Sequence, residues 1–130
     1  MTSRPRRKIL VVEDEDKIAR LLALNLERAG YDVHTDAYGK AALDYAGAHQ
    51  PDLVILDLRL PDIGGYEVCK ELRKMYHSWV VPIVMVTGME QPIDQLRGFA
   101  HGADAYLTKP FEMSDLLETM GLLLGEKTSA

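Results

Sequence analysis

Short runs of consecutive apolar residues recur along the chain, separated by longer stretches of helical spacing. The runs are rich in β-branched and aliphatic side chains, which is typical of strands buried on both faces of a sheet. A more polar segment, Tyr31 to Thr35, is predicted to be a strand at or near a sheet edge. The apolar runs are Ile9 to Val12, Leu53 to Leu56, Ile83 to Val86 and a weaker one around Tyr106 and Leu107.

Between the predicted strands, apolar residues recur every three or four positions, which indicates helices with one buried face. Gly30, Pro51 and Gly102 follow three of the predicted helices, and Pro92 suits the first turn of another. The clearest apolar sets are Ile18, Leu21, Leu22, Leu26 and Ala29; Val68, Cys69, Leu72 and Met75; and Met113, Leu116, Leu117, Met120 and Leu124.

The order of strand and then helix repeats five times. Consecutive strands joined by helices run parallel through right-handed crossovers, so helices cover both faces of the sheet. The predicted fold is therefore an α/β domain with a doubly wound, five-stranded parallel sheet. Ligands of such domains gather at the carboxyl ends of the strands.

The length of 130 residues fits one domain, and a composition of 47% hydrophobic and 27% charged residues is typical of globular proteins. We expect the domain to span residues 8–125. Residues 1–7 are predicted to be a basic tail, and residues 126–130 a C-terminal tail or the remnant of a linker.

Charge and residue usage exclude several kinds of protein. Acidic residues outnumber basic ones by 20 to 15, which argues against direct binding of nucleic acid. The single cysteine, Cys69, is predicted to be a packing residue, and the scattered histidines do not indicate a zinc site. No apolar run is long enough for a membrane span or a signal peptide, so a cytoplasmic domain without a membrane partner is expected.

Polar residues follow the predicted buried strands, where side chains can reach a shared crevice. They are Glu13 and Asp14, Asp57, Thr87 and Lys109. Each alone is commonly a helix cap or a surface residue. Together, three carboxylates repel one another unless a cation offsets them, and Mg²⁺ accepts two or three carboxylates with waters. Such a site suits phosphoryl transfer, with Asp57 as the natural nucleophile.

Four segments resemble the signature stretches of response-regulator receiver domains, in the same order and at similar spacing. The resemblance extends from about residue 7 to residue 124 and implies a (βα)5 fold of the flavodoxin-like or CheY-like kind. The segments are Ile9 to Glu15, Asp52 to Pro61, Val86 to Gly88 and Tyr106 to Phe111.

The resemblance implies a role for each matching residue. Asp57 is the implied phospho-acceptor, and Lys109 is the lysine that contacts the phosphoryl group. Glu13 and Asp14 are the implied acidic pair that binds Mg²⁺ or Mn²⁺ together with Asp57 and the backbone carbonyl of Arg59. The domain would assist its own phosphorylation and dephosphorylation without being an enzyme for external substrates.

Thr87 and Tyr106 are the implied switch residues, and the Lys109-Pro110 bond is expected to be cis. The implied partners are a histidine kinase or a histidine phosphotransfer protein, and a downstream effector. The effector would read the face formed by the fourth helix, the fifth strand and the fifth helix. The stretch Glu112 to Gly125 has no lysine or arginine, whereas receivers that pair through this face before binding DNA usually carry several.

Other classes are less consistent with these residues. A phosphohydrolase of the haloacid dehalogenase type needs a second aspartate two positions after the nucleophile, where this chain has Arg59. The phosphate-binding loop of a flavodoxin-like cofactor protein conflicts with the acidic residues at 13–15. A receiver-like interaction module that is never phosphorylated is a third alternative.

Two positions depart from the usual receiver pattern. Gly64-Gly65 stands where Asp-Gly is more common, so the loop keeps a permissive glycine but lacks a bracing side chain at 64 and is expected to be more mobile. Arg59 replaces a frequent methionine. Its guanidinium either reaches the phosphoryl oxygens or the acidic pair, or lies in solvent.

We hypothesise that Arg59 alters the lifetime of the phosphorylated state. Arg59→Met is then expected to change the rate of dephosphorylation, because a guanidinium beside the phosphoryl oxygens is lost. The measurement is the decay of the phosphorylated protein over time. A decay rate equal to that of the wild type would remove the hypothesis.

Overall fold

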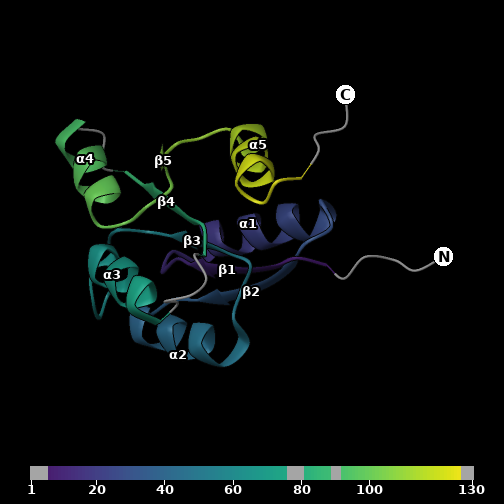
Figure 1. The fold of residues 1–130 in the computed structure, drawn as a ribbon. Coiled ribbons are helices and arrows are strands. Elements are labelled where there is room, and N and C mark those ends of the chain that lie inside the picture. The colour runs from purple at the N-terminus through teal and green to yellow at the C-terminus, as the bar shows by residue number, and fades with distance from the viewer. Residues whose placement is uncertain (1–5, 76–80, 89–91, 127–130) are drawn as a thin grey trace.

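The computed structural model describes residues 6–75, 81–88 and 92–126, which form five strands alternating with five helices (Figure 1). This alternation confirms the predicted α/β architecture. The strands are β1 (Lys8–Val12), β2 (Asp32–Asp36), β3 (Leu53–Leu56), β4 (Ile83–Thr87) and β5 (Ala105–Thr108). The helices are α1 (Asp16–Arg28), α2 (Gly39–His49), α3 (Gly65–Met75), α4 (Pro92–Ala100) and α5 (Met113–Leu123).

All neighbouring strands are parallel, in the order β2-β1-β3-β4-β5. The more polar strand predicted for the sheet edge is β2, which lies there beside β1. From β1, the chain adds β2 on one side and β3 on the other. The carboxyl ends of β1 and β3 therefore flank the crevice in which folds of this kind bind ligands.

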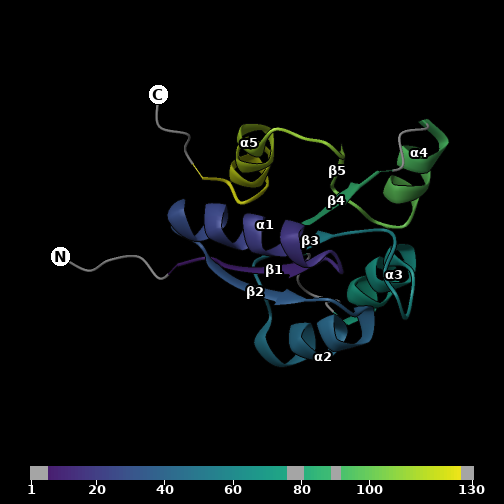
Figure 2. The same ribbon diagram turned by 180° about the vertical axis from the view of Figure 1, so that it is seen from behind.

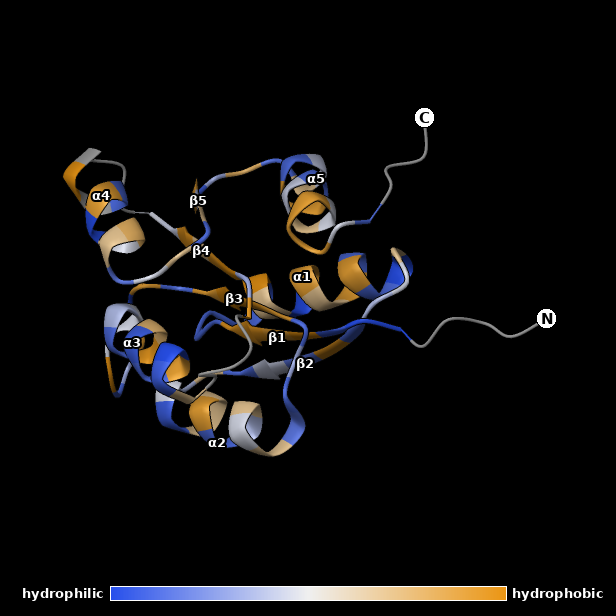
Figure 3. Ribbon diagram, viewed as in Figure 1, coloured by the Kyte–Doolittle hydropathy of each residue, from blue (hydrophilic) through white to orange (hydrophobic). Residues whose placement is uncertain are grey.

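Helices cover both faces of the sheet, with α1 and α5 on one face and α2 and α3 on the other (Figures 1 and 2). Successive side chains of β1 point to opposite faces. Ile9 and Val11 pack with residues of α1 and α5, whereas Leu10 and Val12 pack with residues of α2 and α3. Figure 3 shows the hydrophobic central strands and the paler edge strand β2. Burial on both faces explains the continuous apolar runs in the sequence.

The predicted helix faces are only partly buried. On α1, Leu22 and Leu26 are buried, but Leu21 is 57% exposed and Ala29 is exposed at the helix end. Met75, the last residue of α3, is 43% exposed. The apolar stripes are wider than the strip of each helix that the sheet covers. The prediction of burial was therefore wrong at these three positions.

Asp62 ties the loop after β3 to the start of α2. Its carboxylate oxygens accept hydrogen bonds from the backbone N–H groups of Gly39, at 2.8 Å, and Lys40, at 2.9 Å. Ile63 packs so close to Gly39 that a Cβ there would lie 2.5 Å from its Cγ1. Asp62 thus holds this loop against α2 two positions before Gly64. The greater mobility expected from the missing side chain at 64 stays a prediction.

The hydrogen bonds from Lys40 and Gly39 lower the pKa of Asp62. A carboxyl with a lower pKa in the folded state stabilises the protein above its unfolded pKa, and this contribution is lost as the pH falls through the folded value. We therefore predict that Asp62→Asn lowers the melting temperature at neutral pH, and that the deficit shrinks below about pH 4. Asp44→Asn, an exposed change on α2, is the control. A deficit that is the same at every pH would contradict this account.

Candidate functional site

Lys109 joins two carboxylates at the carboxyl edge of the sheet. Its ammonium group donates hydrogen bonds to Oε2 of Glu13 at 2.9 Å and to Oδ2 of Asp57 at 3.0 Å. The same nitrogen lies 3.7 Å from Oε1 of Glu15. Glu13 follows β1, Asp57 follows β3 and Lys109 follows β5, so the parallel sheet brings together residues from three separate parts of the sequence.

Backbone hydrogen bonds fix these residues where the strands end. The N–H of Glu13 donates to the carbonyl of Asp36, and that of Asp57 donates to the carbonyl of Val12, both at 3.0 Å. The N–H of Lys109 donates to the carbonyl of Thr87 at 2.8 Å. The sheet ladder therefore continues one residue past each strand, which positions the side chains relative to one another. The Lys109-Pro110 bond is cis, as expected.

Three carboxylates form a compact cluster at this edge. Glu13, Asp14 and Asp57 each offer an oxygen atom, and these atoms lie within 4.8 Å of one another. Glu13 and Asp57 are only 3% and 5% exposed, whereas Asp14 is exposed. Among the described residues, none forms a hydrogen bond or ion pair with the Asp14 carboxylate.

The cluster carries more negative charge than Lys109 can balance. Burial raises the pKa of Glu13 to about 7, although the hydrogen bond from Lys109 opposes this effect and the charge of Asp57 adds to it. Burial would lower the pKa of Lys109, but its hydrogen bonds with Glu13 and Asp57 outweigh that effect and the pKa is raised. Lys109 is therefore a stable cation, and the surrounding carboxylates still repel one another.

The donor set fits a hard divalent cation. Three clustered carboxylates supply the oxygen ligands that Mg²⁺ prefers, and the oxygens of Asp14, which have no partner among the described residues, are available to it. The cluster is of the kind that holds Mg²⁺ in receiver domains. Arg59 donates its backbone N–H to Oδ1 of Asp57 at 3.1 Å, which places its backbone beside the cluster. The role of its carbonyl as a ligand stays a prediction.

A cleft of about 320 Å³ opens over the cluster. Thr87, at the end of β4, is 1% exposed and lies in its wall, as predicted for a group that faces the crevice. Tyr106 is half-buried and is not part of this wall; its ring contacts α4 at Gly98. The lining residues are Asp14, Glu15, Asp57, Arg59, Thr87, Gly88 and Lys109.

Two features of the site were not found by sequence reasoning. Glu15 lines the cleft and lies near the Lys109 ammonium group, whereas the sequence shows it only as one of three consecutive acids. Gly65 lies against the backbone of the loop that begins at Asp57. A Cβ at Gly65 would lie 2.5 Å from the Asp57 carbonyl oxygen and 2.7 Å from Cα of Leu58. Glycine is needed here because the backbone of residues 57 and 58 leaves no room for a Cβ at position 65, and not because of its φ angle.

Comparison with known proteins shows the family. Residues 9–120 match the model of the response regulator receiver domain, and the chain belongs to this family. It is 49% identical over 105 residues to the alkaline phosphatase synthesis transcriptional regulatory protein PhoP of Bacillus subtilis (strain 168), a match that covers 81% of this chain and 43% of that protein. It is 41% identical over 117 residues to the DNA-binding dual master transcriptional regulator RpaA of Synechocystis sp. (strain ATCC 27184 / PCC 6803 / Kazusa), covering 90% of this chain and 48% of that protein.

The matches thus span less than half the length of both relatives. Among solved structures, the BeF3-activated N-terminal receiver domain of Klebsiella pneumoniae RstA is similar, with a TM-score of 0.84 and 31% identity. That match covers 91% of this chain and 98% of that one.

Fold, acidic cluster and family together define a receiver domain of a two-component response regulator. Such a domain is regulatory and is not an enzyme for external substrates, so the haloacid dehalogenase alternative is not supported. A receiver domain implies a histidine kinase as its partner. Within the described residues, no helix combines the length and the apolar character needed to cross a bilayer.

The two adjacent glycines after β3 provide a matched pair of substitutions. We predict that Gly65→Ala destabilises the domain by roughly 1 to 3 kcal/mol, because its Cβ would clash with rigid backbone beside Asp57. Gly64→Ala should cost less than about 0.5 kcal/mol, because no atom of the described residues lies within 4 Å of the added Cβ. Urea denaturation measures both. Equal losses of stability in the two variants would contradict the packing argument.

Proposed function

We propose that Asp57 accepts a phosphoryl group from a phosphohistidine. A carboxylate oxygen of Asp57 forms a bond to phosphorus while the phosphorus–nitrogen bond of the donor breaks, and the imidazole leaves in neutral form after taking up a proton. One observation carries the proposal: Asp57 lies in the wall of the cleft, and its two oxygens accept hydrogen bonds from Lys109 and from the Arg59 backbone.

We further propose that Glu13, Asp14 and Asp57, with the backbone carbonyl of Arg59, hold Mg²⁺ or Mn²⁺ at this site. A bound cation would neutralise charge on the phosphoryl oxygens. Lys109 reaches Asp57 from the β5 side and supplies a second positive charge at the nucleophile. Water attack on the phosphorus later returns Asp57 and inorganic phosphate.

The proposed switch begins at Thr87 and ends at a surface. A hydroxyl bond from Thr87 to the charged phosphoryl group contributes about 1.5 to 3 kcal/mol, and Tyr106 is proposed to change rotamer with it. Moving an equilibrium from about 1:99 to 99:1 requires roughly 5.5 kcal/mol, so a partner must supply part of the shift. We propose that an effector binds the face of α4, β5 and α5. The exposed apolar side chains of α4 and α5 include Ile93, Leu96, Phe99 and Leu122.

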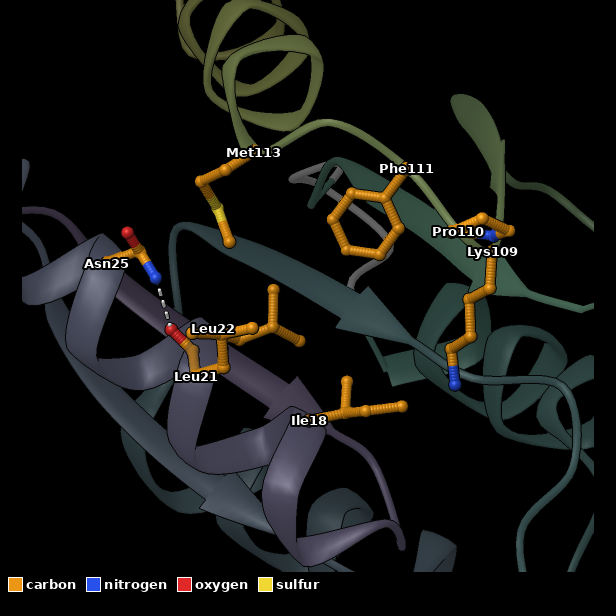
Figure 4. Close-up of a pocket in the computed structure, with 8 residues that line it drawn as sticks. All are labelled: Ile18, Leu21, Leu22, Asn25, Lys109, Pro110, Phe111 and Met113. Carbon is orange, nitrogen blue, oxygen red and sulfur yellow. Dashed lines mark hydrogen bonds between the residues drawn. The ribbon is translucent and has the colours of Figure 1, made fainter.

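A second cavity beside the site provides a place for the phosphodonor. About 510 Å³ in volume, it lies between α1 and the loop that joins β5 to α5 (Figure 4). Phe111 and Met113 line one side, and Ile18 and Leu22 of α1 line the other. Lys109 belongs to this groove and to the acidic cleft, so the two cavities adjoin. We propose that the groove receives a helix of the protein that carries the phosphohistidine.

Phosphorylation of Asp57 is tested with Mg²⁺ and acetyl phosphate, read by intact mass. The wild type is expected to gain the mass of one phosphoryl group, and Asp57→Asn is expected to gain none. Asp44→Asn, on the exposed side of α2, should behave as the wild type does. A wild-type chain that gains no mass would favour the alternative of an interaction module that is never phosphorylated.

Docking of the donor is tested with two exposed leucines on α1. Leu21 lines the groove and Leu24 does not. With a phosphorylated histidine phosphotransfer domain that is active on the wild type, Leu21→Lys should slow transfer about tenfold, or roughly 1.4 kcal/mol. Leu24→Lys should leave the rate unchanged. Phosphorylation of Leu21→Lys by acetyl phosphate should also be unchanged, because a small donor needs only the cleft. A normal rate of protein-to-protein transfer in Leu21→Lys would exclude docking in the groove.

A further inference from the structure

Arg73, near the end of α3, ties down the C-terminal end of α4. Its guanidinium group donates hydrogen bonds to the carbonyl oxygens of Gly102 and Val81. It also pairs with Oδ2 of Asp104 at 2.7 Å. Gly102 has a φ of 106° and lies two residues after the last residue of α4, so the Arg73 side chain holds the end of that helix against α3.

The partners of Arg73 are themselves fixed. Oδ2 of Asp104 also accepts the backbone N–H of Ile83, and the N–H of Asp104 donates to the Ile83 carbonyl, both at 2.8 Å. The Cys69 thiol donates to the carbonyl of His101 at 3.1 Å, and the ring of Tyr66 stacks on that of His101 at 4.6 Å. The end of α4 is therefore held at several points by α3 and by the start of β4.

The rest of α4 is placed by its connection to β4 and by a packing contact with Tyr106. The helix begins at Pro92, shortly after Thr87 and Gly88, which line the acidic cleft. Near its last turn, Gly98 lies against the ring of Tyr106; a Cβ there would lie 3.0 Å from Cδ2 of that ring. The helix thus starts five residues after the proposed switch residue Thr87, lies against Tyr106 and ends near the bonds made by Arg73.

We propose that α4 is a lever anchored at its C-terminal end by Arg73, so that phosphorylation of Asp57 displaces mainly its N-terminal half. This inference rests on the proposed function. Arg73 is a positioning residue, because it does not line the cleft. Ile93 and Leu96 then move more than Phe99. A partner that distinguishes the phosphorylated from the unphosphorylated domain therefore does so near Ile93, at the N-terminal end of α4.

Hydrogen exchange of backbone amides tests the anchor and the lever in separate steps. In untreated protein, Arg73→Gln should speed exchange at residues 100–104 at least tenfold, because the bonds that hold this turn are lost. Lys74→Gln is the matched control, since Lys74 is exposed and, among the residues that the structure describes, pairs only with Glu71. Asp104→Asn keeps an acceptor oxygen but loses the charge, and it should give a smaller increase. This milder variant also serves if Arg73→Gln folds poorly.

Beryllofluoride with Mg²⁺ then serves as the activating ligand. In the wild type, exchange in α4 should change near residues 93–96 and stay constant at 99–102. In Arg73→Gln, the change should extend to the end of the helix, while acetyl phosphate still phosphorylates Asp57 to the wild-type extent.

A change spread evenly along α4 in the wild type would overturn the lever. Wild-type exchange at residues 100–104 in untreated Arg73→Gln would overturn the anchor. A wild-type chain that takes up no phosphoryl group would overturn the proposed function and the lever with it, whereas the untreated proteins would still report on the anchor.

Discussion

The site depends on an imbalance of charge at one edge of the sheet. Lys109 bonds to Glu13 and Asp57 together, and Asp14 stands beside them without a partner among the described residues. Burial reduces the screening of these charges by water, so a positive charge within the site must offset their repulsion. One ammonium group is insufficient for three carboxylates. The fold therefore creates a place where a divalent cation would be stabilised and where the proposed phosphoryl group would meet positive charge.

The same edge connects two surfaces with different chemistry. Lys109 lies between the acidic cleft and the apolar groove against α1, which suits the approach of a donor protein. Thr87 lines the cleft and ends the strand that precedes α4 in the chain, which suits transmission away from the cleft. The proposed surfaces for the phosphodonor and for the effector therefore lie on different elements on either side of one charged centre. A small rearrangement at that centre can reach a distant surface only through packed contacts such as that of Tyr106 with Gly98.

The sequence predicted the central strands and their parallel direction well, because strands buried on both faces appear as continuous apolar runs. It also predicted that Glu13, Asp57, Thr87 and Lys109 lie at one edge, since Thr87 ends β4 and each of the others directly follows a strand. Other features depend on how the elements pack. Leu21 continues the apolar stripe of α1 yet lies outside the strip that the sheet covers.

The contacts made by Asp62 and Arg73 are similar cases: each side chain bonds backbone groups of a distant segment, and no local pattern marks those partners.

The central claim is that the acidic cluster needs a divalent cation, and calorimetric titration with Mg²⁺ tests it most directly. The account predicts that the wild type and Asp44→Asn bind the ion, and that Asp14→Asn binds at least tenfold more weakly while the metal-free variant is no less stable than the wild type. Equal affinity of Asp14→Asn and the wild type for Mg²⁺ would contradict it.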